Sequence, residues 1–250
     1  MGGRLVSVPL SPPKNSMKTH GKKYKAAKAL VTQKIYTLDE AVALLKKTSI
    51  TKFDGSCEVH VNLGIDPKKS DQMVRSTVAL PHGTGKEVRV IAFVGEDKVK
   101  ECKAAGAVKA GGEDLAEEIA KGWLEFDVAI ATPDMMKALG KISKILGPKG
   151  LMPNPKAGTV TTDVINAIGQ IKKGKVEFKS DKFGVVHNMF GKVSFGEKEL
   201  KENLLTLLKA LNDSKPASVK GVFIEGVSLA TTMGPGITVD SSKTLLEQLK

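Results

Sequence analysis

The chain lacks the features that would place it in a membrane, outside the cell or around a zinc ion. No apolar run in its 250 residues approaches the roughly 20 residues needed to span a bilayer, and the basic N-terminus has no continuous apolar segment typical of a secretory signal. Its two cysteines, Cys57 and Cys102, are too far apart to indicate a disulfide framework or a zinc cluster. We expect a reducing, cytosolic setting and no membrane partner.

Histidines and aromatic residues are also scarce. The four histidines are scattered, and none has metal-site spacing or lies beside a serine or cysteine in a catalytic signature. We therefore expect no catalytic residue, no metal and no cofactor. With 8 Phe, 2 Tyr and 1 Trp, the chain has few rings for stacking unpaired bases, which favours folded RNA recognised by shape and backbone over single strands.

Positive charge is what the chain has in excess. Its 39 Lys and Arg against 27 Asp and Glu give a net charge of +12. This balance favours a polyanionic partner, although a solvated lysine-rich surface would explain the charge equally well. Residues 84–174 hold 14 basic and 12 acidic side chains, whereas the remainder holds 25 and 15. The remainder is therefore expected to bind the polyanion.

The N-terminal part differs from the interior of the chain. Residues 1–16 contain three prolines and no periodicity, so we expect a disordered extension or a tag. Residues 14–34 hold seven lysines and no acid, which is typical of a disordered solvated tail or of an RNA-contacting arm. An organellar transit peptide is the weaker interpretation because arginine and serine are few in this segment.

Hydrophobic periodicity indicates an α+β architecture at the two ends of the chain. Thr37 and Glu40 form a capping-box pattern in front of an amphipathic helix, and residues 57–65 alternate like a half-buried strand that packs on a helix. Residues 76–80 are predicted to be the partner of that strand. The later expected elements are strands at 176–178, 185–188, 219–232 and 237–239 and a leucine-striped helix at 197–211.

The middle of the chain alternates strands with helices. Apolar runs at 88–94 and 126–131 predict strands buried on both faces. Helices are expected near 96–105, 113–121 and 162–172, and from the cap at Thr132 and Pro133 to about Leu146. This alternation with short links implies βαβ units and a parallel sheet.

These patterns predict two domains. Residues 17–83 plus 175–250 would form a discontinuous α+β domain that binds RNA, and residues 84–174 would form an inserted Rossmann-like α/β domain of three layers. Gly83 and Gly174 stand at the two junctions and are expected to form the hinge between the domains.

Three loops invite a phosphate-binding interpretation. The string GTGK at 83–86 fails as a P-loop, because Leu80 stands where a glycine is required and Glu87 replaces Ser or Thr. The segment 141–156 has four lysines and no acid, and is either a phosphate-binding loop or a proline-stiffened connection. The uncharged segment 231–236 would permit close approach to ribose and phosphate, or is a plain hairpin loop.

Two rival functions are weaker on the residues. An enzyme built on the inserted segment lacks the glycine-rich fingerprint, since Gly95-Glu96-Asp97 follows the first strand. A membrane-surface binder would need an exposed amphipathic helix, and the leucine stripe at 197–211 fits better as the cover of a sheet.

Several short strings occur in a fixed order between about Met17 and Val239. They are KFD at 52–54, EVH at 58–60, LGIDP at 63–67, SDQ at 70–72, LPHGTGK at 80–86, ATPD at 131–134, LGPKGLMPNPK at 146–156 and TTMGP at 231–235. In this order they resemble the bacterial type of the L-one family of large-subunit ribosomal proteins. The family fold agrees with the predicted discontinuous domain, insertion and hinge.

The resemblance implies a function that composition does not reveal. Such a protein is a non-enzymatic constituent of the large ribosomal subunit in the cytoplasm. It binds a mobile stalk of large-subunit rRNA near the exit-site tRNA, and it represses translation of its own-operon mRNA through a similar RNA structure. It is expected to be a monomer off the ribosome.

The resemblance also implies the RNA-binding residues. Two segments carry the main contact, through Lys52, Phe53 and Ser56 in one and Thr232, Met233 and Gly234 in the other. Three residues in neighbouring strings extend this contact, namely Glu58, His187 and Lys192. Lysine suits phosphate, hydroxyl groups suit sugar, and a glycine permits close approach. Gly55 departs from the pattern, because many relatives carry Glu there, and residues 1–16 and 241–250 fall outside the resemblance.

Overall fold

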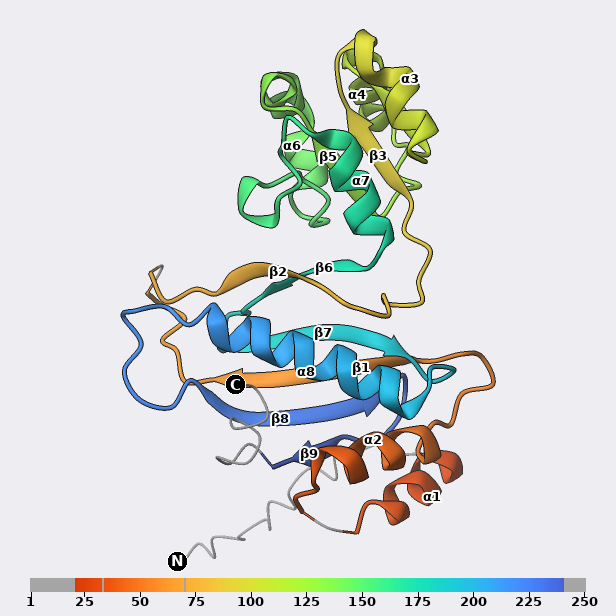
Figure 1. Ribbon diagram of the computed structural model, residues 1–250, viewed down its shortest axis with the longest axis vertical. Coiled ribbons are helices and arrows are strands. Elements are labelled where there is room, and N and C mark those ends of the chain that lie inside the picture. Colours follow the sequence, from red (N-terminus) through yellow and green to blue (C-terminus); the bar gives the residue numbers. More distant parts are fainter. Residues whose placement is uncertain (1–20, 33, 70, 241–250) are drawn as a thin grey trace, which may run out of the picture.

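The computed structural model describes residues 21–32, 34–69 and 71–240 (Figure 1). The expected N-terminal extension 1–16 and the segment 241–250 lie outside these residues. Within the basic arm, helix α1 (Lys22–Leu30) is formed, so the first of its two interpretations, a disordered tail, is wrong for that stretch, and the RNA-contacting arm stays a prediction. Three alanines and a leucine among its lysines favour a helix, and Ala27 is buried.

A four-stranded antiparallel sheet, in the order β7-β1-β8-β9, carries most of one core. Its strands are β1 (Ser56–Leu63), β7 (Val185–Lys192), β8 (Ile224–Thr231) and β9 (Ile237–Val239). The alternation in β1 is confirmed, because Cys57, Val59 and Val61 are fully buried and the residues between them are not. β7 continues four residues beyond the strand expected at 185–188, and β8 begins at Ile224 rather than at 219.

The predicted pairing of β1 with residues 76–80 is wrong. β7 occupies one edge of β1 and β8 the other, so β1 has no free edge for a third strand. Residues Arg75–Ala79 form β2, which instead pairs with β6 (Lys175–Lys179) in a separate two-stranded ribbon. Proximity in the sequence suggested the wrong partner.

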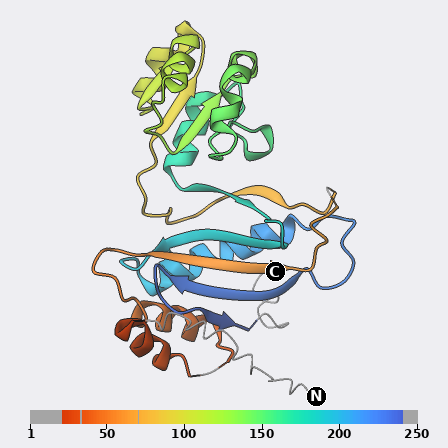
Figure 2. The ribbon, with the colours of Figure 1, turned by 180° about the vertical axis from the view of Figure 1, so that it is seen from behind.

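Two helices cover one face of the four-stranded sheet and pack against each other, α2 (Leu38–Lys47) and α8 (Glu197–Asp213). The capping box of α2 is confirmed, since the Thr37 N–H donates to Glu40 Oε2 at 3.2 Å. α8 lies in front of the sheet in Figure 1 and behind it in Figure 2. Its apolar stripe is fully buried, comprising Leu200, Leu204, Leu207, Leu208 and Leu211.

The burial of that stripe removes the basis of the membrane-surface alternative, because these leucines already pack against the sheet. None of the helices in the described part of the chain combines the length and the apolar character needed to cross a membrane.

The middle of the chain forms the predicted parallel sheet, with strands in the order β4-β3-β5. The strands are β3 (Val90–Phe93), β4 (Lys109–Gly111) and β5 (Val128–Ala131), and the flanking helices are α3 (Glu96–Ala104), α4 (Glu113–Ala120) and α7 (Val164–Lys172). Successive residues of β3 enter two different apolar clusters, one on each face of the sheet. Burial on both faces explains why the run at 88–94 is continuously apolar. β4, three residues long, was too short for periodicity to predict.

The single helix expected from Pro133 to Leu146 is wrong. The chain instead makes four short turns of helix, η1 (Pro133–Met135), α5 (Met136–Leu139), η2 (Gly140–Ile142) and α6 (Ser143–Leu146). Gly140 lies in the middle, where glycine disfavours a continuous helix, and the Ser143 hydroxyl donates to its carbonyl at 2.8 Å. A further 3-10 turn, η3 (Pro155–Ala157), follows the basic loop.

Two chain segments join the β2–β6 ribbon to the parallel-sheet unit, and they touch at Gly83 and Gly174. Both glycines have left-handed backbone angles, with φ of +66° and +100°. A Cβ on Gly174 would lie 2.4 Å from the Gly83 Cα, and the Leu80 N–H donates to the Gly174 carbonyl at 3.2 Å. Only glycine fits this backbone-to-backbone contact.

An ion-pair cluster connects the first of these segments to β5. Lys86 Nζ lies 2.8 Å from Asp127 Oδ1, and Arg89 Nε lies 3.2 Å from Asp127 Oδ2. Partial burial raises the pKa of Asp127, but hydrogen bonds from Lys86 and Arg89 outweigh it and lower that pKa to about 2.

We predict that Asp127 stabilises the fold in a pH-dependent way. A carboxyl whose pKa is depressed in the folded state contributes stability above the unfolded-state pKa of about 3.9. That contribution is lost as pH falls through about 2. Urea unfolding of wild type and Asp127→Asn between pH 7 and pH 2 should show wild type more stable above pH 4, with the difference shrinking below it. A difference that stays constant over this range would contradict the prediction.

Candidate nucleic-acid interface

One end of the four-stranded sheet brings together most of the residues expected to bind RNA. Because β1 runs antiparallel to both neighbours, its first residue lies beside the last residues of β7 and β8 (Figure 1). Ser56 lies opposite Lys192, and Cys57 lies opposite Thr231. The loop before β1, the end of β7 and the loop after β8 therefore form one surface, which we call the sheet-end surface. It comprises residues 52–56, Lys192 and residues 232–234.

Hydrogen bonds within the protein hold the two loops of this surface together. The Ser56 N–H donates to Thr232 Oγ1 at 2.9 Å, and the Thr232 N–H donates to the Ser56 carbonyl at 3.0 Å. The Thr232 hydroxyl also lies 3.4 Å from that carbonyl. Thr232 therefore positions the two loops, and its expected contact with a sugar stays a prediction.

The Gly55 position is packed between these loops. Gly55 is buried, and a Cβ there would lie 3.1 Å from Thr51 Oγ1 and 3.5 Å from Thr232 Cβ. A larger residue at this position must displace Thr51 slightly before it can direct a side chain outward. Compared with the glutamate that many relatives carry here, Gly55 therefore changes the spacing of the two loops and also lacks a negative charge.

The outward-facing groups of the surface are a cation and two large apolar side chains. Lys52 is exposed, and Phe53 and Met233 have 64% and 73% of their surface accessible. Among the described non-glycine residues, Met233 alone has a positive φ, at 63°. A left-handed conformation costs a non-glycine residue roughly 1–2 kcal/mol. Strained backbone of this kind recurs at binding sites, which makes the exposed Met233 a candidate for contact with a ligand.

Gly234 is required by the packing of the protein itself. A Cβ at this position would lie 2.2 Å from Thr231 Oγ1, 3.2 Å from the Thr231 carbonyl and 3.4 Å from the Thr48 carbonyl. Any side chain would therefore distort the loop before RNA is considered. Close approach of RNA is not needed to explain this glycine, and a Gly234 variant would report on loop packing.

Asp54 is a residue of this surface that sequence reasoning missed. Its carboxylate accepts hydrogen bonds from the Ser194 N–H at 3.0 Å and the Ser194 hydroxyl at 2.8 Å. Lys192 Nζ lies 4.0 Å from the same carboxylate. Asp54 thus fixes the loop before β1 to the segment after β7. The KFD string contained Asp54, but only the fold reveals its partner.

The structure separates His187 from the sheet-end surface. His187 lies opposite His60, four residues along β1 from Ser56, which corresponds to about 13 Å at the rise of a strand. Its Nδ1 lies 2.8 Å from His60 Nδ1, so one ring donates and the other accepts. Glu58 lies between, two residues along β1 from Ser56, on the face opposite the helices. The predicted set therefore extends along β1 instead of forming one cluster.

The described residues offer little support for an enzyme. They contain no group of three or more His, Cys, Asp or Glu side chains that could hold a metal ion. Both cysteines are buried, and burial raises the pKa of the Cys57 thiol to about 12, which keeps it protonated at neutral pH. The GTGK string lies in the connecting segment, beside a cleft of about 1110 Å³ at the glycine contact, and not between a strand and a helix.

The basic loop at 147–156 faces the β2–β6 ribbon. Its residues Gly147, Gly150 and 152–155 line a cleft of about 690 Å³ together with Arg75, Lys179 and His187. Arg75 pairs with Glu177 within this cleft. Whether the loop binds phosphate stays a prediction.

Comparison with known proteins defines the class of this chain. Residues 45–235 match the model of the ribosomal protein L1p/L10e family, a span that includes β1, β7, β8 and the entire sheet-end surface. The chain belongs to this family, as its short strings indicated, and it is a structural, non-enzymatic ribosomal protein.

Relatives of high identity share nearly the full length. The chain is 54% identical over 228 residues to large ribosomal subunit protein uL1 of Kosmotoga olearia, covering 91% of this chain and 99% of that protein. It is 55% identical over 226 residues to large ribosomal subunit protein uL1 of Thermosipho africanus, covering 90% and 97%. The protein of the same name from Maridesulfovibrio salexigens is 52% identical over 224 residues, covering 90% and 96%.

We predict that His187 contributes to the lowered pKa of His60. Burial lowers the pKa of His60 below its usual value, and the neighbouring His187 lowers it further. In His187→Gln the second cause disappears, so the His60 pKa should rise towards 6.5 without reaching it. An NMR titration of the His60 ring would measure the change. An unchanged His60 pKa would show that the two rings do not interact as the 2.8 Å contact implies.

Proposed function

We propose that the sheet-end surface binds the mobile stalk of large-subunit rRNA near the exit-site tRNA. The observation that carries this proposal is Met233, which is exposed, strained at φ +63° and on the loop that is hydrogen-bonded to the loop of the exposed Phe53 and Lys52. Local strain that folding does not need is often retained at binding sites. The family assignment and the relatives named large ribosomal subunit protein support the choice of rRNA.

The chemistry of the surface suits folded RNA. Lys52 and Lys192 can approach phosphate oxygens, while the flat ring of Phe53 and the thioether of Met233 can pack on ribose or an exposed base. Asp54, Ser56 and Thr232 are already hydrogen-bonded to protein groups, so they fix the shape of the surface before RNA arrives. Preorganisation of this kind lowers the ordering cost of binding.

The same proposal includes a division into two domains. Residues 17–83 plus 175–250 would form the RNA-binding domain and residues 84–174 the inserted one, with the hinge at Gly83 and Gly174. The apolar clusters support this division, because the cluster of the four-stranded sheet draws on residues up to Leu80 and from Val176 onward. The two clusters of the parallel sheet draw only on residues between Val88 and Ile171.

Further roles follow from the family resemblance alone. We propose that the protein acts on the large subunit of the cytoplasmic ribosome and contacts exit-site tRNA there. We also propose that it represses translation of its own-operon mRNA, and that it is a monomer off the ribosome. The sheet-end surface would serve both RNAs if the mRNA folds like the stalk.

A salt titration with two RNAs tests the main proposal. Wild type should bind a folded stalk fragment of large-subunit rRNA more tightly than a scrambled RNA, with a shallower dependence on salt. Lys52→Ala should weaken stalk binding and reduce the salt slope by about 1, because one phosphate contact is lost. Lys209→Ala, on the exposed face of α8, removes the same charge away from the surface and should leave stalk binding nearly unchanged. Equal losses in the two variants would show that only net charge matters.

Met233 provides a second test that separates stability from binding. Met233→Gly relieves the left-handed strain and should stabilise the protein by about 1 kcal/mol, whereas Met233→Ala keeps most of the strain. Both variants remove the exposed thioether and should weaken stalk binding several-fold. Urea unfolding and binding assays would measure the two effects. Wild-type affinity in both variants would remove Met233 from the interface.

A further inference from the structure

Helix α8 carries an amide in the middle of its leucine stripe. Asn203 is completely buried, beside Leu200, Leu204 and Leu207, which are also completely buried. A leucine would continue the stripe at this position. Burial of an amide is unfavourable unless its polar atoms find partners, so the position calls for a specific set of hydrogen bonds.

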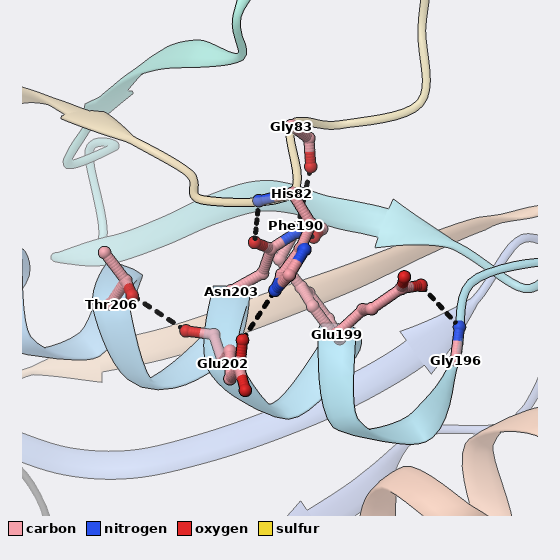
Figure 3. Close-up of polar contacts among 8 residues, drawn as sticks. All are labelled: His82, Gly83, Phe190, Gly196, Glu199, Glu202, Asn203 and Thr206. Atoms are coloured by element: carbon pink, nitrogen blue, oxygen red, sulfur yellow. Dashed lines mark hydrogen bonds and ion pairs between the residues drawn. The ribbon is translucent and has the colours of Figure 1, made fainter.

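The partners of Asn203 are backbone groups of two other segments (Figure 3). Its Oδ1 accepts from the His82 N–H at 3.1 Å, and its Nδ2 donates to the Gly83 carbonyl at 2.8 Å and to the Phe190 carbonyl at 2.9 Å. Both hydrogens of the amide are thus used. Asn203 ties the first connecting segment to α8 and to β7 at the same time.

A second contact reinforces the same attachment. His82 Nε2 lies 2.5 Å from Glu202 Oε2, one residue before Asn203 on the helix (Figure 3). This contact is solvent-exposed, so it is weaker than the buried amide. These two contacts hold the first connecting segment on α8 up to Gly83. Two residues later Gly85, at φ +70°, lies against the Phe195 ring, since a Cβ there would be 2.8 Å from it.

We propose that Asn203 is the positioning residue of the hinge. It fixes the first connecting segment at Gly83, which touches Gly174, so that the two segments meet at one level before they enter the inserted domain. The return segment is held by strand pairing instead, because β6 begins at Lys175 in register with Ala79 of β2. This inference rests on the proposed hinge at Gly83 and Gly174, and it concerns the orientation of the inserted domain, not the RNA contacts.

No other side chain of similar size meets all three requirements. Leucine leaves the His82 N–H and the carbonyls of Gly83 and Phe190 without a partner, and aspartate cannot donate to either carbonyl. Asn203→Leu removes the attachment and keeps the same branched arrangement of side-chain heavy atoms. Asn203→Ser is a milder variant that keeps a hydroxyl, in case the first variant does not fold.

The experiment measures the attachment and the hinge separately. Hydrogen exchange of the His82 amide reports the attachment, and electron-spin distance measurements between nitroxides at Glu117→Cys on α4 and Lys209→Cys on α8 report the domain orientation. Cys57 and Cys102 are fully buried, which favours labelling at the two exposed sites. Asn212→Leu, on the same helix but away from the connecting segment, is the matched control.

In Asn203→Leu we expect exchange at His82 to accelerate at least about tenfold, as one buried hydrogen bond implies. The distance distribution should broaden, stalk RNA affinity should stay within about twofold of wild type, and Asn203→Ser should give the same changes to a smaller degree. Asn212→Leu should show none of these changes. Faster exchange with an unchanged distance distribution would overturn the positioning role and leave Asn203 a purely structural residue.

The distance measurement on wild type tests the proposed hinge separately from Asn203. A single narrow distance in wild type, with and without stalk RNA, would refute the mobile hinge. Broadening in Asn203→Leu against that narrow background would still support Asn203 as the residue that fixes the orientation. Identical distributions and exchange rates in all variants would overturn the proposal for Asn203.

Discussion

The structure depends on one strand, β1, being enclosed by β7 and β8. Both partners come from the far side of the segment that forms the parallel sheet. Pairing them with β1 requires the chain to leave and return at one place, which is where Gly83 and Gly174 touch. The same pairing leaves β2 without a place in the main sheet, so β2 and β6 form the ribbon next to the two connecting segments. The strand order of the main sheet and the contact between Gly83 and Gly174 thus follow from a single long-range pairing.

That pairing also creates the sheet-end surface. Antiparallel order places the beginning of β1 beside the ends of its two neighbours, and the hydrogen bonds between Ser56 and Thr232 close the surface. Several polar groups of the surface are hydrogen-bonded within the protein: Thr232 bonds to Ser56, and Asp54 bonds to Ser194. What remains outward is Lys52, Phe53 and Met233. A surface built in this way has a fixed shape before any ligand binds, which suits recognition of a folded RNA by shape.

Sequence reasoning was most successful where the signal is local. The capping box at Thr37 and Glu40, the alternation of β1 and the apolar run of β3 each reflect a burial pattern within a few residues. It failed for the helix expected through Gly140, because the apolar periodicity continues across a glycine at which the helix breaks. It also failed for β4, because three residues are too few to show a periodicity. It also failed for the partner of β1, since pairing with distant strands leaves no mark in either segment. Most of the expected RNA-binding residues meet at one sheet end, whereas His187 lies elsewhere on the open face.

The sequence by itself determined the family, the basic character and the type of most elements, because short strings, composition and periodicity are properties of the chain alone. Only the tertiary structure decided what individual residues do. Gly234 avoids a clash with Thr231, Thr232 bonds to Ser56, and Asn203 holds a segment more than a hundred residues away. The physical reason is that a glycine, a hydroxyl or an amide acquires a role only from the atoms around it. Those atoms come from parts of the chain that are distant in sequence and are brought together only by folding.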